Sequence, residues 1–377
     1  MAVNVFFELL QISLGNKDAL NSVPSSDEWE DLYEEAEKQA VTGIMLAGLE
    51  RLPDQQRPSQ KFLLQWIGVG EMIRNQNRLL DKNCQKMLSL LKDYGIKGSI
   101  LKGQGIALLY QPAKGEFDKG LRELRQSGDI DVYVDCGQKK AFEFAITVVP
   151  KVTNWDYKNL HLSLADDVEV EIHYRVEILM NLIKNRKLQK WFRENEALLF
   201  EENNEFTTPT TLFNVFYILL HIYRHFLYEG VGFRQIIDYY MVLRAVNCTK
   251  LDVRYSKEIV SKFGVERFAK GLMWVMRECL GMPCEWMLWE PDEKEGKYIL
   301  KQVMQGGNFG HYDERLLHKR GKLGAVADIL RHNMHLFLHY PADVLWAPVW
   351  IVWHKLWKVC VGNKLTVKAY DYRYRTA

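Results

Sequence analysis

Residues 129–134 read Asp129-Ile130-Asp131-Val132-Tyr133-Val134, in which polar and apolar side chains alternate and β-branched residues occupy one face. Such alternation predicts a β-strand, because successive side chains of a strand point to opposite faces. Both aspartates then point to the same side. Further along, residues 161–174 read HLSLADDVEVEIHY, two alternating runs joined by a turn-forming ADD, which predicts an antiparallel hairpin. Its second strand carries Glu169, Glu171 and His173 on one face.

Two aspartates on one strand and a third carboxylate on a nearby strand place hard oxygen ligands around one point. That is the ligand type that magnesium prefers, and two such ions can bridge a triphosphate. We therefore predict that Asp129 and Asp131, together with a third carboxylate for which we choose Glu171 on the resemblance described below, are catalytic and bind two Mg²⁺ or Mn²⁺ ions. Geometry alone leaves Glu169 as an alternative third ligand. Taken by itself, an Asp-x-Asp pair is more often a solvated strand edge.

A second signal precedes the aspartates. Residues 96–101 (IKGSIL) are compatible with a strand, Lys102-Gly103 predicts a tight turn, and residues 105–111 (GIALLYQ) predict a helix. A turn from a strand into a helix can direct backbone N–H groups at phosphate. The alternative is an ordinary turn.

The rest of the chain has mainly helical periodicity. Residues 25–28 offer a helix N-cap, a long amphipathic run ends at Gly95, and residues 211–230, 233–246 and 255–279 are helical in pattern. This predicts an α+β protein with a small mixed sheet flanked by helices. We expect a helical N-terminal region at 1–95, a core at 96–200 and a helical C-terminal domain at 201–377.

These motifs resemble a known superfamily. The order of elements is similar to that in the core of the DNA polymerase beta-type nucleotidyltransferases. That core runs strand, glycine turn, helix, a strand with the pattern hDhDh (h, hydrophobic), and a third strand with an acidic residue. The chain resembles more narrowly a bacterial family of uncharacterised nucleotidyltransferases, with the pattern L-K-G, R-x-x-G-D-I-D, [DE]-h-H and a helical half containing a spaced His pair, Arg and Asp. The residues that carry this resemblance are Leu101-Lys102-Gly103, residues 125–131 (RQSGDID), Glu171-Ile172-His173, His221, His225, Arg234 and Asp238.

The resemblance implies that an NMP is transferred from an NTP, ATP among them, to an acceptor with release of pyrophosphate. Glu171 would be a metal ligand and a candidate base. The acceptor is left open among a sugar, another small molecule, a protein and RNA. Implied nucleotide-binding residues are Lys102, Gly103, Arg125, Ser127, Gly128 and Arg234. Implied supporting residues around the site are His173, His221, His225 and Asp238.

Two departures and three alternatives accompany this prediction. Lys102 stands where the superfamily usually has Gly or Ser, and Glu171 replaces the commoner Asp. His221 and His225 lack the intervening glutamate of zinc proteases, so they serve either a helical core or the substrate. Arg234 and Asp238 are spaced for an intrahelical ion pair, which competes with triphosphate binding by Arg234. A catalytically silent nucleotide-binding or interaction protein remains the alternative function.

Composition excludes other roles. Fifty basic and 48 acidic residues give a net charge of +2, so bulk DNA binding is disfavoured. Six scattered cysteines form no C-x-x-C motif, and the N-terminus lacks the basic segment of a signal peptide, so we expect a cytoplasmic protein.

One aromatic stripe lies near the C-terminus. Trp346, Trp350, Trp353 and Trp357 recur at helical spacing. We predict a helix at 341–360 that packs on the protein body. Contact of these tryptophans with a membrane surface is the less favoured alternative.

Overall fold

The computed structural model describes residues 2–110, 121–148, 152, 154–164, 168–313 and 336–375, and the side chains of these residues apart from 2, 3 and 362–375. The turn at 165–167 that the sequence predicts lies outside the described residues. Chain contacts divide the protein into two units that interleave along the sequence. Unit 1 comprises Met1–Leu79, Ile106–Ser127 and Thr211–Asp328, and unit 2 comprises Leu80–Gly105, Gly128–Thr210 and Ile329–Ala377.

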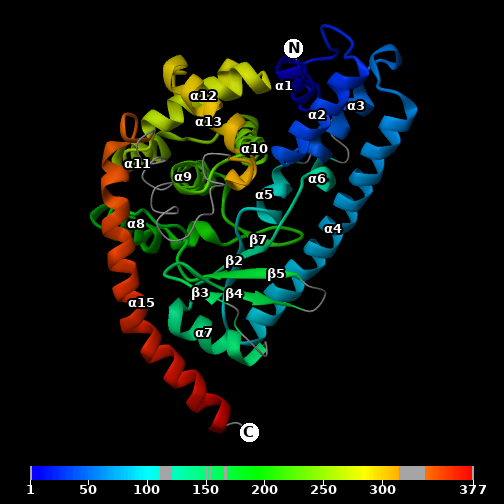
Figure 1. Ribbon diagram of the computed structural model, residues 1–377. Helices are drawn as coiled ribbons and strands as arrows, with labels where there is room; N and C mark the ends of the chain where they lie inside the picture. Colours follow the sequence, from blue (N-terminus) through cyan, green and yellow to red (C-terminus); the bar gives the residue numbers. More distant parts are fainter. Residues whose placement is uncertain are drawn as a thin grey trace, which may run out of the picture. The chain divides into compact units, whose positions relative to one another are not determined.

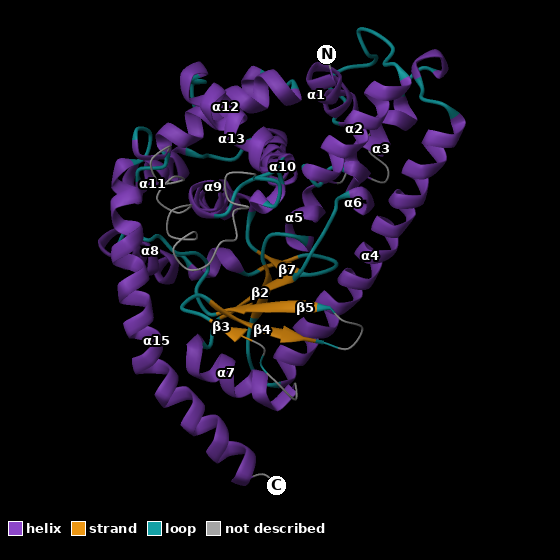
Figure 2. Ribbon diagram, viewed as in Figure 1, coloured by secondary structure: helices purple, strands orange, loops and turns teal. Residues whose placement is uncertain are grey.

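Unit 2 contains a mixed five-stranded sheet of order β1-β2-β5-β4-β3 (Figures 1 and 2). Its strands are β1 (Gly98–Ile100), β2 (Ile130–Val134), β3 (Asn154–Trp155), β4 (Asn159–Ser163) and β5 (Glu169–His173). β2 pairs with β5 in parallel, and every other pair is antiparallel. The small mixed sheet and the β4–β5 pairing agree with the sequence prediction. Together with the helical ends of the chain they confirm the α+β class.

β2 is buried along its whole length and is an inner strand of this sheet, paired with β1 on one side and β5 on the other. Its apolar residues Ile130 and Val132 pack in one core with Val170 and Ile172 of β5. The alternation that sends these side chains to the core sends Asp131 to the opposite face. Helices α7 (Gly137–Val148) and α8 (Leu182–Glu194) and a two-stranded sheet of β6 (Glu201–Glu202) and β7 (Thr207–Thr208) complete this part of unit 2.

Unit 1 is helical. Its helices are α1 (Ala2–Ser13), α2 (Ser26–Lys38), α3 (Thr42–Arg51), α6 (Leu121–Leu124), α9 (Thr211–Tyr228), α10 (Phe233–Thr249), α11 (Arg254–Phe263), α12 (Glu266–Leu280) and α13 (Glu293–Gly306). α2 begins as predicted, because the side chain of Ser25 accepts from the backbone N–H of Glu28 and the Glu28 carboxylate accepts in return. α4 (Gln60–Asp93) is the long predicted helix, and Gly95 follows it with a positive φ of 65°.

Two helical predictions need correction. The run at 255–279 is divided into α11 and α12 by Gly264, whose φ of 76° ends the first helix in the left-handed region that glycine favours. The helix predicted after the Lys102-Gly103 turn is only one turn long, α5 (Gln104–Ala107), and continues as a 3₁₀ turn at Leu108–Tyr110. The dipole of such a short helix is correspondingly small.

The C-terminal helix α15 (Pro341–Arg375) confirms the predicted packing of the tryptophan stripe. Trp350 is only 6% exposed, and the Tyr157 ring lies 5.5 Å from Trp350 and 5.1 Å from both Trp353 and Trp357, measured between ring centroids. These aromatic contacts fix one face of α15 on unit 2. No helix in the described part of the chain has the length and apolar character needed to cross a bilayer.

Candidate metal and nucleotide site

Asp131 lies on β2, an inner strand of the sheet, and is the most buried carboxylate of the predicted site. It is 4% exposed, and its backbone oxygen accepts from the N–H of Leu101, which joins β2 to the chain that leaves β1. Its Oδ1 lies 2.9 Å from Lys102 Nζ and 2.7 Å from His173 Nε2. Such a carboxylate is stable as an anion only because positive charge and a hydrogen-bond donor surround it.

Glu171 is the direct partner of Asp131 in the parallel pairing of β2 and β5. Its Oε2 accepts from Asn159 Nδ2 at 2.5 Å and lies 3.1 Å from His173 Nε2, while His161 Nδ1 lies 3.5 Å from its Oε1. Glu169 is exposed and does not take part in this group of side chains. The register of the sheet therefore places Glu171, and not Glu169, beside Asp131.

The donor set fits a divalent cation. One ligand atom each from Asp131, Glu171 and His173 lies within 4.8 Å of the other two. Carboxylate oxygens suit Mg²⁺ and Mn²⁺, and an imidazole nitrogen extends the range towards the later transition metals. The buried Nδ1 of His173 has no hydrogen-bond partner among the described residues. In the metal-free protein we therefore assign the ring proton to Nε2, from which it is donated to the two carboxylates. Nε2 would have to lose this proton before it could bind a cation.

The pKa of Asp129 is shifted in the opposite direction from the pKa values of Asp131 and Glu171. Burial alone would raise the pKa of Asp131, but Lys102 and the hydrogen bond from His173 outweigh burial and lower it. Burial likewise opposes ionisation of Glu171, whereas His173 and Lys102 hold its pKa well below the usual range. The negative charge of Asp131, together with burial, raises the pKa of Asp129 to about 6. The cluster thus holds more negative charge than its own lysine balances.

The turn at Lys102-Gly103 is built for a close approach to β2. Gly103 has a φ of 54°, and a Cβ added there would lie 3.7 Å from the backbone oxygen of Asp129. Glycine is required for the backbone angle more than for space. The turn brings Lys102, 17% exposed at its side chain, to Asp131. The sequence prediction placed this lysine at phosphate, and the structure places it against a predicted metal ligand.

Arg125 belongs to a second buried cluster, within unit 1. Its Nε and Nη2 donate to Asp238 Oδ1 and Oδ2 at 2.7 and 2.8 Å, and the Tyr110 hydroxyl donates to Oδ1 at 2.7 Å. Its Nη1 donates to Ser127 Oγ at 3.0 Å. Arg125 and Asp238 are 4% and 5% exposed. Arg125, which the sequence predicts to bind the nucleotide, is therefore held in a bidentate ion pair with Asp238.

The other residues that the resemblance implicates lie in unit 1, apart from the exposed Gly128 at the start of a unit 2 segment. Arg234 donates to the backbone oxygen of Gln126 at 3.1 Å, and its guanidinium carbon lies 5.4 Å from the Phe309 ring centroid. His221 and His225 are buried, with ring centroids 4.3 Å apart, and His225 Nδ1 lies 2.6 Å from a Glu229 carboxylate oxygen. These contacts are those of a packed helical core.

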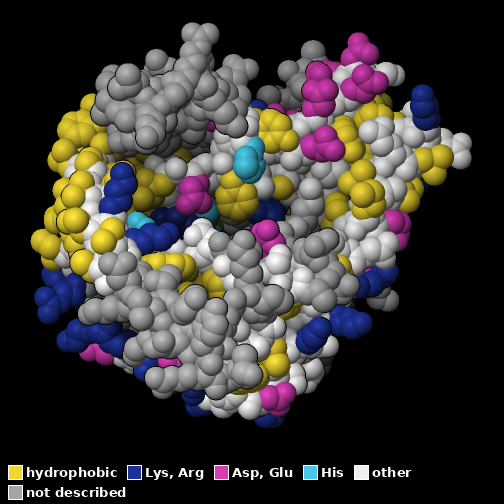
Figure 3. Space-filling view, turned by 60° about the horizontal axis from the view of Figure 1, so that its bottom comes forward, with side chains coloured by type: hydrophobic (Ala, Val, Ile, Leu, Met, Phe, Trp, Pro, Cys, Tyr) yellow, Lys and Arg dark blue, Asp and Glu magenta, His cyan; other side chains and the backbone are white. Residues whose placement is uncertain are grey.

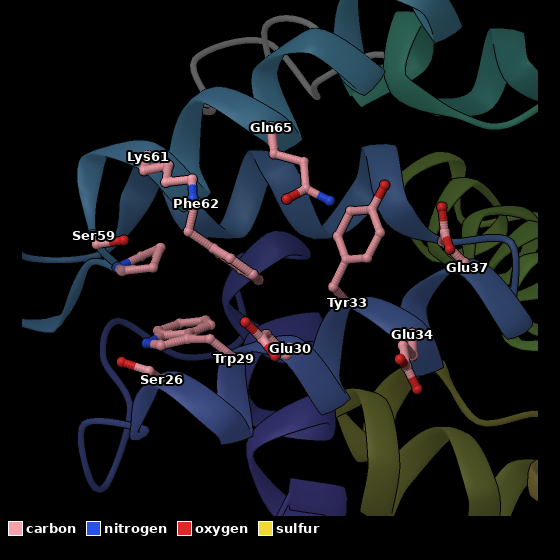
Figure 4. A pocket seen from close by; sticks show the side chains of 11 residues that line it. Ser26, Trp29, Glu30, Tyr33, Glu34, Glu37, Ser59, Lys61, Phe62 and Gln65 are labelled. Atoms are coloured by element: carbon pink, nitrogen blue, oxygen red, sulfur yellow. The ribbon is translucent and has the colours of Figure 1, made fainter.

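A surface pocket in unit 1 is chemically unsuited to a triphosphate. It has a volume of about 510 Å³ and lies between α2 and the start of α4 (Figure 4). Trp29, Tyr33 and Phe62 line it, but so do Glu30, Glu34 and Glu37, against the single cation Lys61. The excess of carboxylates would repel phosphate groups, so this pocket is a poor nucleotide site.

Three residues that contact the two clusters were not predicted from the sequence: Asn159, His161 and Tyr110. Asn159 and His161 lie on β4 opposite β5, and the hairpin register pairs His161 with Glu171. A register drawn on the predicted hairpin would have found His161, because alternate residues of paired strands share a face. Asn159 lies two residues before the start of that predicted hairpin. Tyr110 contacts Asp238 over 128 positions of sequence, and no local pattern signals that contact.

Comparison with known proteins agrees with this geometry. Residues 25–281 match the family described as uncharacterised nucleotidyltransferase. The match spans more than half of the chain, and the protein belongs to this family. No curated protein and no solved structure gives a significant match.

Proposed function

We propose that the protein is a metal-dependent nucleotidyltransferase that transfers an NMP from an NTP to an acceptor hydroxyl or phosphate. The observation that carries the proposal is the convergence of Asp131, Glu171 and His173 within 4.8 Å in a chain of this family. The raised pKa of Asp129 beside Asp131 supports it, because surplus buried negative charge favours a bound cation. We assign the catalytic core to residues 96–200, and the remaining residues to helical regions on either side.

Asp129, Asp131 and Glu171 would hold two divalent ions, Mg²⁺ or Mn²⁺. Bound there, the ions would neutralise the triphosphate and activate the attacking oxygen. In the balanced reaction an acceptor oxygen forms a bond to the α-phosphorus, the bond to the bridging β-phosphate oxygen breaks, and pyrophosphate leaves. The acceptor proton goes to a base or to water.

The residues of the chain divide these tasks. Glu171 suits the role of ligand better than that of base, because a carboxylate with a lowered pKa accepts protons weakly. His173 fixes both carboxylates through one N–H group and so keeps their spacing. Lys102 neutralises Asp131 and is partly exposed, which suits it to meet a phosphate as a point charge. For Arg125, Ser127, Gly128 and Arg234, binding of phosphate stays a prediction.

The activity suits the cytoplasm, where NTPs and Mg²⁺ are abundant, and we propose that location. The acceptor is a sugar, another small molecule, a protein side chain or RNA. Bulk DNA is disfavoured by the near-neutral charge. His221, His225 and Asp238 would support the helical domain instead of touching the substrate.

The test is a screen of the purified protein with each α-labelled NTP, with Mg²⁺ or Mn²⁺, and with small-molecule, RNA and protein fractions as acceptors. Transfer of label that needs metal and is lost in Asp131→Asn is the expected result. Metal-dependent NTP binding without transfer to any fraction would favour the silent nucleotide-binding protein instead. Absence of both binding and transfer would overturn the proposal.

A further inference from the structure

The outer face of α15 carries an apolar stripe that the tryptophan packing leaves uncovered. Leu345, Val349, Val352, Leu356 and Val359 recur at spacings of four, three, four and three, and each is between 46% and 63% exposed. On an α-helix these five residues fall within an arc of about 80°. We call these five residues the aliphatic stripe. A single exposed valine needs no explanation, but an aligned row of five does.

The flanks of the stripe differ in chemistry. On one side lie the half-buried Trp346 and Trp353, whose face of the helix packs on Tyr157. On the other side lies Lys355, which is exposed. Lys358 lies further round towards the protein body, is half-buried, and has its Nζ 5.2 Å from the Trp155 ring centroid. Figure 3 shows hydrophobic side chains gathered along the edge on which Figure 1 draws α15, with Lys and Arg side chains beside them.

The charge of this helix is strongly one-sided. Among the described side chains of residues 341–361 the one acidic residue is Asp343, and it is buried. From residue 355 to the end the sequence contains one acidic residue, Asp371, against six basic ones, Lys355, Lys358, Lys364, Lys368, Arg373 and Arg375. The exposed Lys355 beside the stripe and this excess of basic residues in the sequence favour a partner that supplies negative charge as well as apolar contact.

We propose that α15 docks the protein on the surface of an anionic lipid bilayer, with the aliphatic stripe entering the headgroup region and Lys355 beside it meeting lipid phosphates. A helix with an apolar face, basic residues and a tryptophan flank is typical of interfacial binding. Each basic residue near such a surface strengthens binding by a factor of about five. The sequence offered the tryptophans as the side chains that would contact a membrane. In the structure Trp350 is packed on the protein, and the proposed lipid contact is on the opposite side of α15.

A second copy of the chain fits this surface less well. The four-three spacing of the stripe is also that of a coiled-coil seam, where flanking residues of opposite charge select the partner. A second α15 would bring Lys355 towards another basic helix and would offer no exposed acidic side chain among residues 341–361. Charge complementarity therefore favours the anionic bilayer.

The test is flotation of the full chain with vesicles of phosphatidylcholine alone or of phosphatidylcholine mixed with phosphatidylglycerol. We expect binding to the mixed vesicles only, weakened at high ionic strength. Val352→Glu combined with Leu356→Glu should lower the partition coefficient by more than about tenfold, because apolar contact is lost and negative charge is added. Lys355→Gln should lower it by about fivefold.

The matched control is Met72→Glu combined with Ile183→Glu, two residues on α4 and α8 that are 72% and 61% exposed. It adds the same charge outside α15 and should bind vesicles like the unaltered protein. Failure to bind anionic vesicles, or equal loss in both double variants, would overturn the proposal. So would a dimer in sedimentation velocity that Val352→Glu with Leu356→Glu dissociates, because the stripe would then belong to a second copy.

Discussion

The two buried charged clusters of this protein use their carboxylates in opposite ways. In unit 1 a single carboxylate, Asp238, receives two bonds from Arg125 and one from Tyr110, so the opposite charges balance and every contact is short. In unit 2 the carboxylates of Asp131 and Glu171 share His173 and Lys102, and the pKa of Asp129 is raised by its neighbour Asp131. The first cluster is complete as it stands, and the second has surplus negative charge.

This is the difference that we expect between a structural and a functional site. Breaking a buried balanced pair leaves an isolated charge, so its loss harms stability above all. A cluster with surplus charge is held together against its own repulsion, which is characteristic of sites that bind a cation. Substitutions in the unit 1 cluster should accordingly lower stability above all, and substitutions in the unit 2 cluster should lower activity and metal binding.

The largest expected effect is on activity. Asp131→Asn keeps the shape of the side chain and removes its charge, so transfer should fall to background and the stabilisation by Mg²⁺ should disappear. For the unaltered protein that stabilisation is about 2.7 kcal/mol when free metal is 100 times its Kd. Radiolabel transfer and thermal unfolding with and without Mg²⁺ measure the two effects. A variant that keeps both would remove Asp131 from the site.

The next effect is on stability. Arg125→Ala should lower the free energy of unfolding by roughly 3–5 kcal/mol, because Asp238 is left as a buried charge without its main partner. Denaturant unfolding measures this loss, and Arg254→Ala is the control. Arg254 pairs with Asp252 at the surface, where ion pairs contribute little, so its removal should leave stability unchanged. Weakened NTP binding in Arg125→Ala without loss of stability would assign Arg125 to the nucleotide after all.

A smaller effect, an increase in the free energy of unfolding, is expected when Asp129 is replaced. The pKa of Asp129 is about 6 in the folded protein and about 4 in an unfolded chain. Between these values the folded state binds more protons, so stability falls as pH rises from about 4 to about 6 and stays lower above. Asp129→Asn removes this loss. It should raise the free energy of unfolding at pH 7, without metal, by about 1–3 kcal/mol, and by nothing at pH 4.

At pH 7 without metal, Asp129→Asn should be more stable than the unaltered protein. Mg²⁺ should reverse that order, because it stabilises the unaltered protein more than the variant. Unfolding curves at the two pH values, with and without Mg²⁺, test both statements. If Asp129→Asn proved less stable than the unaltered protein at pH 7 without metal, the surplus of negative charge would be refuted.

The smallest effect is expected at Glu169, two residues before Glu171 on β5. Its side chain is exposed and lies outside the cluster. Glu169→Gln should change stability by less than about 0.5 kcal/mol and leave transfer intact. Glu171→Gln should abolish transfer. Equal losses in the two variants would reopen the choice of third ligand.

The sequence could predict those features that depend on local periodicity. The alternation at residues 129–134 and the hairpin after it correctly indicated β2, β4 and β5, because one face of each strand is apolar. Gly95 and the capping pattern at Ser25 correctly indicated the end of α4 and the start of α2. The break at Gly264 was missed, since apolar residues continue at helical spacing on both sides of it.

The partners of the charged residues depended on contacts between distant segments. Arg234 and Asp238 have the spacing of an intrahelical pair, yet Asp238 is engaged by Arg125, 113 positions away. Lys102 was expected at phosphate and lies at Asp131, because β1 and β2 pair and the turn after β1 returns towards β2. Such choices are made by tertiary packing, which one sequence does not reveal.

The central claim is that the carboxylates of unit 2 bind a divalent cation, whereas the Arg125–Asp238 cluster does not. Titration of the full chain with Mn²⁺, followed by the electron paramagnetic resonance of the free ion, measures this directly. We predict saturable binding that Asp131→Asn abolishes, that Asp238→Asn leaves in place in its folded fraction, and that Mg²⁺ displaces. No saturable binding, or binding that is unchanged in Asp131→Asn, would contradict the claim.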